Sequence, residues 1–283
     1  MKTLAFVILA AALPVGAHAQ GADNQPTTPY RIADNLYYVG ASDIVVYLVT
    51  TSAGSILIDA GYKETVPIIR ANVAALGLKV EDIKIILNTQ AHYDHSAGLA
   101  EMKTLTHAQL MASDADASLL EAGGHDDYLF GDRFTFPAVK VDRRLTDGDE
   151  VKLGGTVLTA HVTPGHTKGC TTWTMDVRDR GKTYKVVIVG GTSINPGTKV
   201  SGMAMYPNIT RDFSYTFEAL KTLPCDIFLG AHRAYYGGTA KAKQLLANPD
   251  GPNPFVDPEG YKRFVDAAQK RFQDQLASER QKR

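Results

Sequence analysis

The segment Gln90–His95, with the sequence Gln-Ala-His-Tyr-Asp-His, constrains this chain more than any other part of its sequence. It directly follows the short, largely apolar run Ile83–Leu87 and the linking residues 88–89. A run of this kind predicts a buried strand. On a loop at a strand end, nearby side chains can converge on one point, and His92, Asp94 and His95 offer the nitrogen and oxygen ligands that zinc takes. The segment therefore predicts a metal site.

Two further histidines are placed as distant ligands of such a site should be. His166 lies in Thr163–Gly169, a tight glycine-flanked turn between two predicted strands, and His232 follows the apolar strand Ile227–Gly230. Both are at strand ends, so we expect them to join the first segment. The other histidines of the mature chain lack partners at ligand spacing and are predicted to be structural or surface residues: His107, His125 and His161.

Short β-rich runs alternate with helical ones along the chain, and this pattern occurs twice. It predicts a layered α/β domain with sheets inside and helices outside. No linker is evident, so we expect a single domain over residues 20–283. The predicted strands are Ile44–Thr50, Ser55–Asp59, Ile83–Leu87, Gln109–Ala112, Val139–Val141, Thr156–His161, Thr171–Val177, Tyr184–Val189 and Ile227–Gly230. The predicted helices are Glu64–Leu76, Ala97–Leu105, Asp114–Ala122, Phe213–Thr222, Ala240–Leu246 and Tyr261–Ala277.

The first nineteen residues read as a secretory signal peptide. Lys2 precedes the apolar run 4–13, and Ala17-His18-Ala19 provides small residues at a cleavage site. The run is too short for a transmembrane anchor, which needs about 20 apolar residues. We expect cleavage after Ala19 and a soluble periplasmic protein that is not held in a membrane. Residues 20–35 are predicted to form an extended arm.

The composition limits the kinds of partner that this chain can bind. The chain has 30 basic and 30 acidic side chains, a balance that argues against a nucleic-acid partner. We expect a monomer. Cys170 and Cys225 lie at the entries to predicted buried strands, where we expect two free, buried thiols, although a disulfide is left open. The long loop Gly123–Pro137 is rich in glycine, aspartate and aromatic residues and is predicted to be functional.

The motifs resemble those of the metallo-β-lactamase superfamily. Gln90-x-His92-x-Asp94-His95, Gly165-His166-Thr167 and Gly230-Ala231-His232 carry this resemblance. Several further stretches resemble the class B β-lactamases of subclass B3, and the likeness covers nearly the whole mature chain: Leu145–Asp149, Leu153–Thr156, Leu158–His161, Thr163–Gly169, Gly124–Asp127, Leu223–Asp226 and Asp266–Ala268.

This resemblance implies an αββα sandwich of two ββα halves, with the metals at the seam between them. It implies a first zinc site of Gln90, His92 and His166, and a second of Asp94, His95 and His232. Gln90 stands where the family usually has a histidine, and its amide is a poorer ligand. We hypothesise that the first site is weaker and that the enzyme works with only the second site filled. Gln90 as a mere hydrogen-bonding neighbour remains an alternative.

Thr192 bears on the choice of reaction. It stands where much of the superfamily has an aspartate that bridges both metals, and its neighbours offer no carboxylate or cysteine. The resemblance therefore favours a β-lactamase that hydrolyses penicillins, cephalosporins and carbapenems and confers antibiotic resistance. Zinc-bound hydroxide would attack the β-lactam carbonyl and Asp94 would orient it. Thr192, Ser193 and Asn195 are candidate anchors for the substrate carboxylate.

Three alternatives stay open. Tyr128, Leu129 and Phe130 either form one wall of the pocket or pin their loop to the body of the domain. The enzyme could instead hydrolyse another small ester or lactone. A non-catalytic, exported metal-binding protein is the third, and it predicts metal binding without hydrolysis.

Overall fold

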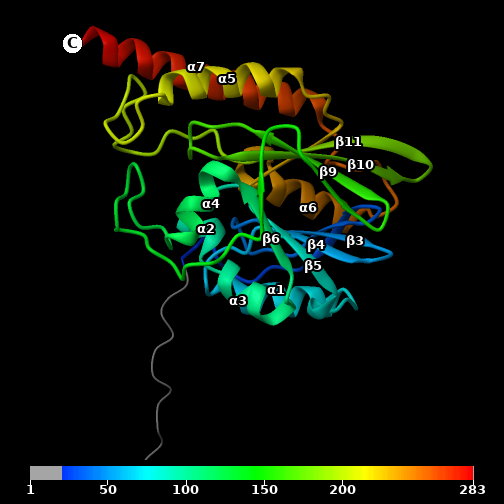
Figure 1. The fold of residues 1–283 in the computed structure, drawn as a ribbon. Coiled ribbons are helices and arrows are strands. Elements are labelled where there is room, and N and C mark those ends of the chain that lie inside the picture. The colour runs from blue at the N-terminus through cyan, green and yellow to red at the C-terminus, as the bar shows by residue number, and fades with distance from the viewer. Residues whose placement is uncertain (1–20, 283) are drawn as a thin grey trace, which may run out of the picture.

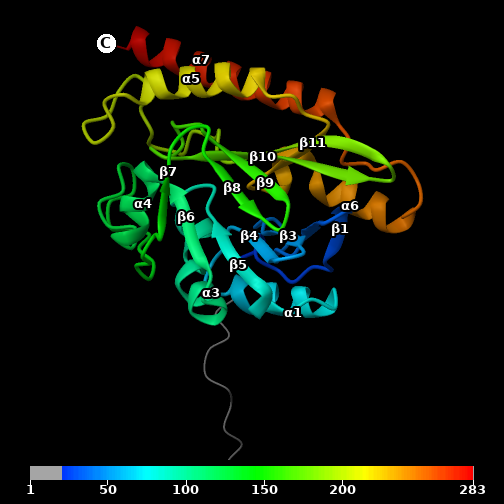
Figure 2. The same cartoon turned by 45° about the vertical axis from the view of Figure 1, so that its right-hand side comes forward.

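The computed structural model describes residues 21–282, so the predicted signal peptide of residues 1–19 lies outside the described part. Two sheets pack face to face, and helices cover the outer face of each (Figures 1 and 2). The chain thus forms four layers in the order α, β, β, α, as the sequence predicted. The helices are α1 (Thr65–Ala75), α2 (Tyr93–Ser96), α3 (Leu99–Thr106), α4 (Asp114–Glu121), α5 (Ile209–Thr222), α6 (Gly238–Ala247) and α7 (Pro258–Gln281).

The first sheet has seven strands in sequence order. Its first four strands pair antiparallel, and the pairs from β4 to β7 are parallel. Helices α1 and α3 connect parallel neighbours and lie on the outer face (Figure 2). The strands are β1 (Tyr30–Ala33), β2 (Leu36–Tyr38), β3 (Tyr47–Thr51), β4 (Gly54–Ile58), β5 (Ile83–Leu87), β6 (Gln109–Ser113) and β7 (Arg143–Leu145).

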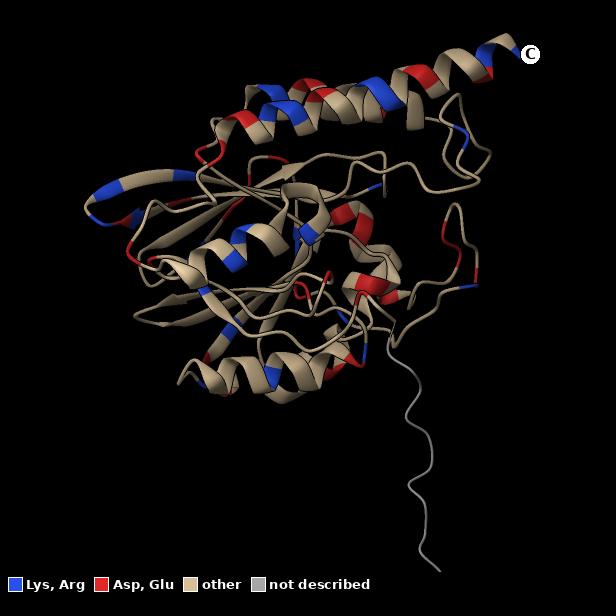
Figure 3. Cartoon of the chain, turned by 180° about the vertical axis from the view of Figure 1, so that it is seen from behind, with Lys and Arg blue, Asp and Glu red and all other residues tan. Residues whose placement is uncertain are grey.

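The second sheet has five strands in the order β12-β11-β10-β9-β8. Only β11 and β12 pair parallel, and the other neighbours are antiparallel. Helices α5 and α7 lie side by side on its outer face (Figure 1). Both basic and acidic residues occur on these two helices (Figure 3). The strands are β8 (Glu150–Leu153), β9 (Thr156–Val162), β10 (Thr171–Asp179), β11 (Lys182–Val189) and β12 (Ile227–Gly230).

The main core lies between the sheets and beneath α5 and α7. Trp173, Tyr47 and Phe228 are among its largest fully buried side chains. A second core packs α1 and α3 against the first sheet. Burying each large apolar side chain contributes about 1.5–3 kcal/mol, so these cores hold the strand ends, and hence the loops beyond them, in fixed positions.

Local signals explain where the helices start and stop. Ser113 caps α4 by accepting from the Asp116 amide, and Asp257 caps α7 by accepting from the Gly260 amide. Pro258 opens α7, where the missing N–H costs nothing. Beyond α1, Gly77 adopts φ +72°, which glycine takes without steric cost.

One predicted strand is wrong, and three strands were not predicted. Residues 139–141 form no strand, because the amides of Val139 and Val141 donate to the end of α4 rather than to a neighbouring strand. The strand lies instead at Arg143–Leu145. The predicted arm over residues 20–35 contains β1, and β2 and β8 were not predicted either.

Within residues 21–282, no helix has the length and apolar character needed to cross a bilayer. The two cysteines are free, as expected, although Cys225 is only partly buried while Cys170 is fully buried.

Candidate metal centre

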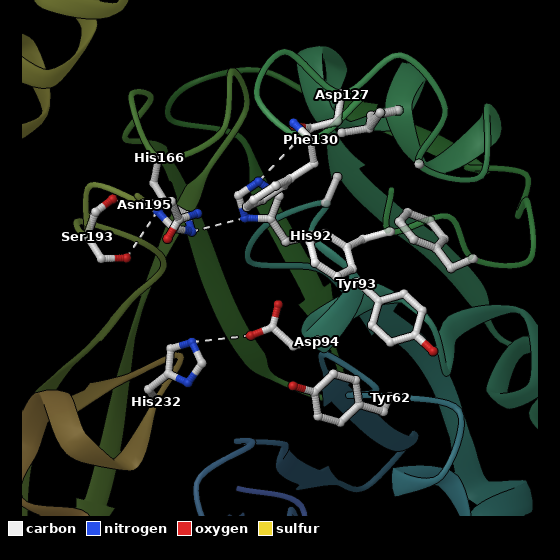
Figure 4. A pocket seen from close by; sticks show the side chains of 15 residues that line it. Tyr62, His92, Tyr93, Asp94, Asp127, Phe130, His166, Ser193, Asn195 and His232 are labelled. Atoms are coloured by element: carbon white, nitrogen blue, oxygen red, sulfur yellow. Dashed lines mark hydrogen bonds and ion pairs between the residues drawn. The ribbon is translucent and has the colours of Figure 1, made fainter. Parts of the chain in front are cut away.

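The predicted ligand segments meet at one pocket of about 380 Å³ (Figure 4). Gln90–His95 follows β5 and enters the short helix α2, His166 lies in the turn between β9 and β10, and His232 follows β12. Both sheets thus contribute, since β5 belongs to the first sheet and the other strands to the second.

Asp94, His95 and His232 form a compact cluster. The Asp94 Oδ2 atom lies 3.1 Å from His95 Nε2 and 3.4 Å from His232 Nε2, and the two imidazole nitrogens are 3.3 Å apart. Their donor atoms all lie within 4.8 Å of one another, so one cation can contact all three. Two imidazoles, a carboxylate and an open side toward the pocket suit a catalytic zinc site.

His92 and His166 form a second pair beside this cluster. His92 Nδ1 lies 3.1 Å from His166 Nε2. The Gln90 side chain is 1% exposed, does not line the pocket, and has no hydrogen-bond partner for either amide atom among the described residues. An orphaned buried amide costs about 1–3 kcal/mol, and a metal ligand bond to its oxygen would remove the part of that cost that comes from the oxygen. The donor types of Gln90, His92 and His166 therefore suit a cation.

Each of the four histidines turns its other ring nitrogen toward an acceptor, as metal-binding histidines usually do. In a neutral imidazole, a hydrogen bond of this kind fixes the ring and its tautomer and leaves the inward nitrogen with a free lone pair. The pairs are His95 Nδ1 with Asp59 Oδ2 at 3.1 Å, His232 Nδ1 with Asp43 Oδ2 at 3.3 Å and His166 Nδ1 with the Ser193 carbonyl at 2.7 Å. His92 Nε2 faces Asp127 Oδ2 at 3.7 Å, which is beyond hydrogen-bond distance.

The three supporting aspartates were not predicted from the sequence. Asp59 ends a predicted strand, like the ligands themselves, and this position could have indicated it. It also accepts hydrogen bonds from the Thr89 amide and hydroxyl at 2.7 and 2.6 Å, so it ties β4 to the ligand segment. Asp43 and Asp127 lie in loops, where nothing in the local sequence indicates that they approach a histidine.

The charges of the centre suit cation binding. Burial alone would raise the pKa of the Asp94 carboxyl, but His95 and His232 hold it well below its usual range. Burial, with His92 nearby, lowers the pKa of His166 to about 3, which leaves this imidazole neutral. Burial opposes protonation of His95, yet the Asp94 and Asp59 carboxylates raise its pKa to about 10. A cation bound by His95 must therefore displace a proton.

The pocket walls are aromatic on one side and polar on the other. Tyr62, Tyr93, Phe130 and Phe134 line it, and no lysine or arginine is found among the described residues that do. Ser193 and Asn195 also line the pocket, whereas Thr192 is buried and does not.

The loop over residues 123–137 both lines the pocket and is pinned to the body of the domain, the two roles that the sequence left open. The Phe130 ring lies 5.4 Å from the His92 ring and forms part of the wall. Tyr128 pins the loop, because its hydroxyl donates to the His166 carbonyl at 2.9 Å. Leu129 is not a wall residue; its amide donates to Asp127 Oδ1.

The histidines predicted to be structural or surface residues lie outside the pocket. His161 Nε2 lies 2.9 Å from Thr174 Oγ1 in the neighbouring strand. His107 is exposed at the end of α3, and His125 contacts Asp132 on the surface.

Comparison with known proteins assigns the family. The family model described as "Metallo-beta-lactamase superfamily" matches residues 39–232, which contain every candidate ligand. The chain belongs to this superfamily. Its four-layer fold is the sandwich of that superfamily, which confirms the predicted fold class and resemblance.

Two solved metallo-β-lactamases resemble the chain over almost its whole length. Native FEZ-1 from Legionella gormanii is 42% identical, with a TM-score of 0.88, and the match covers 91% of this chain and 98% of FEZ-1. BJP-1, a subclass B3 enzyme of Bradyrhizobium japonicum, is 40% identical, with a TM-score of 0.85, and the match covers 92% and 97% of the two chains.

Curated relatives match more partially. A hydroxyacylglutathione hydrolase of Rhodospirillum rubrum is 31% identical over 45% of this chain and 41% of its own length. The chain aligns with only 34% to 41% of the length of the first curated relatives that it matches.

Proposed function

We propose that this chain is a zinc-dependent β-lactamase of subclass B3 that opens the lactam ring of penicillins, cephalosporins and carbapenems and confers resistance to them. The observation that carries the proposal is a pocket with two adjoining clusters of ligand-type side chains, in a chain that matches two metallo-β-lactamases at 40% and 42% identity over nearly their full length. With the signal peptide predicted from the sequence, we further propose that it acts in the periplasm on this small-molecule substrate.

The geometry of the two clusters supports an assignment of the ligands. We assign Asp94, His95 and His232 to one zinc and Gln90, His92 and His166 to the other, in line with the resemblance. Zinc, when bound, acidifies water and polarises a carbonyl oxygen, so that hydrolysis runs at neutral pH without a side-chain nucleophile. The Asp94/His95/His232 group supplies a carboxylate, whereas the Gln90/His92/His166 group supplies only neutral donors. We therefore propose that the Asp94/His95/His232 group is the more secure site and is sufficient for activity.

The chain's own residues then orient the reactants. The Asp94 carboxylate is ionised and its Oδ2 faces His95 and His232, so we assign Oδ1 to accept a hydrogen bond from the attacking water. The ring-opened product needs a proton on its nitrogen, and water in the open pocket can deliver it. Ser193 and Asn195 line the polar wall and are our candidates for the substrate carboxylate. Thr192 is buried behind them, and we propose that it shapes this wall rather than touching substrate.

A second candidate is hydrolysis of another ester, lactone or thioester. The curated hydroxyacylglutathione hydrolase favours it. Thr192 argues against it, because related thioesterases and lactonases are expected to have a bridging aspartate at that position.

Imipenem hydrolysis with and without a chelator, followed by added zinc, tests the proposal. We expect activity to fall on chelation and return with zinc. His232→Ala should abolish this rescue, and His107→Asn, a change at an exposed histidine outside the pocket, should not. Asparagine suits the control because His107 adopts the left-handed backbone conformation that asparagine tolerates.

The same proteins assayed on an acyl-homoserine lactone and on a glutathione thioester separate the two candidates. Turnover of either without turnover of imipenem would refute the β-lactamase. Imipenem hydrolysis that persists after chelation would refute a metal mechanism of any kind. Zinc binding with no hydrolysis of any of the three substrates would favour the non-catalytic protein.

A further inference from the structure

Asp116 is a buried carboxylate beside the metal centre that is neither a ligand candidate nor part of the pocket lining. It lies in the first turn of α4 and is 2% exposed. Both of its oxygens accept hydrogen bonds. Oδ2 accepts from the Ala91 amide at 2.9 Å and from the Thr167 hydroxyl at 2.7 Å, and Oδ1 accepts from the Gly169 amide at 2.8 Å.

These three donors belong to the two segments that carry Gln90, His92 and His166. Ala91 stands between Gln90 and His92, and Thr167 directly follows His166. The first segment extends from β5 in one sheet and the second from the turn before β10 in the other sheet. One carboxylate therefore ties together two loops that come from different halves of the domain.

The approach of α4 to the second loop is specified by a glycine. A Cβ atom at Gly169 would clash with the Ser113 hydroxyl and the Asp116 amide, so any larger residue would force the loop away from the helix. Ser113 adds to the contact, since its hydroxyl donates to the Gly169 carbonyl while also capping α4. The hydrogen bonds to Asp116 thus lie where α4 and the loop around Gly169 are in close contact.

We propose that Asp116 is the positioning residue for Gln90, His92 and His166, and that it sets the spacing these side chains need to hold one ion together. The inference rests on the proposed assignment of that ligand group. It differs from the role of Asp59 and Asp43, which contact the imidazoles of His95 and His232 directly. Loss of Asp116 should therefore weaken one metal site and leave the other intact.

The test measures metal affinity in chains that keep only one site. His232→Ala leaves the Gln90/His92/His166 group, and His166→Ala leaves the Asp94/His95/His232 group. Cobalt(II) is titrated into each by its visible absorption, with and without Asp116→Asn. In the chain that keeps Gln90/His92/His166, the first group, we expect Asp116→Asn to raise the cobalt dissociation constant by about 10- to 100-fold, the range for lost outer-shell contacts. In the chain that keeps Asp94/His95/His232, the second group, the dissociation constant should stay within about twofold.

Asp114→Asn is the matched control. Asp114 lies in the same helical turn but is exposed and pairs with Arg144, so neither dissociation constant should change. Because Asp116→Asn could disturb folding, Thr167→Val provides a milder test, since it removes one donor and keeps the shape of the side chain. Thr167→Val should weaken only the first group, and Thr167→Ser, which keeps the hydroxyl, should bind like wild type.

Each outcome decides between the alternatives. Unchanged affinity of the first group in both Asp116→Asn and Thr167→Val would overturn the role of Asp116 while leaving the proposed sites standing. Equal weakening of both groups would also overturn it, because Asp116 would then be a general folding residue. If the His232→Ala chain binds no cobalt at millimolar concentration, the first ligand group itself is wrong, and the inference falls with it.

Discussion

Replacing Gln90 with methionine should stabilise the metal-free protein. Both amide atoms of Gln90 are buried without a hydrogen-bond partner among the described residues, and the side chain is 1% exposed. Such an orphaned amide costs about 1–3 kcal/mol. Methionine has nearly the same length and fills the same space without polar atoms, and imperfect packing takes back part of the gain. We expect a net gain of about 1–2 kcal/mol.

For a chain of this size, 1 kcal/mol shifts the unfolding temperature by about 2–4 °C, so metal-free Gln90→Met should unfold roughly 2–8 °C higher than wild type. Gln275→Met is the matched control. The Gln275 amide donates to the Thr198 carbonyl and the Glu279 carboxylate, both at 2.8 Å, so the same substitution there should lower the unfolding temperature. The two variants make the same substitution at an amide without partners and at an amide with two.

Zinc should reverse the order of the two unfolding temperatures, so that wild type unfolds at a higher temperature than Gln90→Met. If Gln90 is a ligand, zinc at about 100 times its dissociation constant adds about 2.7 kcal/mol to wild type through the first site, more than Gln90→Met gains. Scanning calorimetry of chelator-treated and zinc-loaded proteins measures both effects. An unfolding temperature at or below that of wild type in the metal-free variant would refute the orphaned amide. An equal zinc-induced rise in both proteins would refute Gln90 as a ligand.

Three further predictions concern residues around the centre. Asp43→Asn should weaken metal binding at the Asp94-containing site by about 10- to 100-fold, measured by competition with a chelating dye, because His232 loses its supporting carboxylate; unchanged affinity would contradict this. Burial alone would raise the pKa of Glu279, but its hydrogen bonds, including those from the Val200 and Ser201 amides, lower the pKa below 4.5. The ionised Glu279 therefore stabilises the fold above pH 4.5, and this stabilisation is lost as the pH falls further. Glu279→Gln should therefore lower the unfolding temperature at pH 7 and by less at pH 3, and a constant difference would argue against the charge. Phe134→Ala should raise KM about 2- to 10-fold for β-lactams with aromatic acyl groups and change it little for β-lactams with small ones. The reason is that Phe134 lines the pocket, with its ring centroid 5.1 Å from that of Phe130. Equal effects on both substrate classes would rule out a specific contact.

The sequence predicted elements well where burial and backbone preference coincide locally. Ile83–Leu87 is a strand with the predicted bounds, and α4 begins at the predicted residue because Ser113 caps it. Prediction failed where a distant partner decides. The strand β1 exists because it pairs with β2, and the Tyr30 and Tyr38 rings stack 5.1 Å apart. Residues 139–141 alternate like a strand, yet their amides donate to α4.

For the candidate metal centre, the sequence alone determined the types of the candidate ligands and their places at strand ends, because a strand followed by closely spaced ligand-type residues is a local pattern. The tertiary structure decided which atoms face one another. His95 and His232 lie 137 residues apart, and their nitrogens come within 3.3 Å because two sheets pack face to face. The same packing brings Asp43, Asp59 and Asp127 behind the histidines and Asp116 between the two loops. Local sequence encodes burial and backbone preference over a few residues, but the spacing between distant segments is set by strand pairing and core packing.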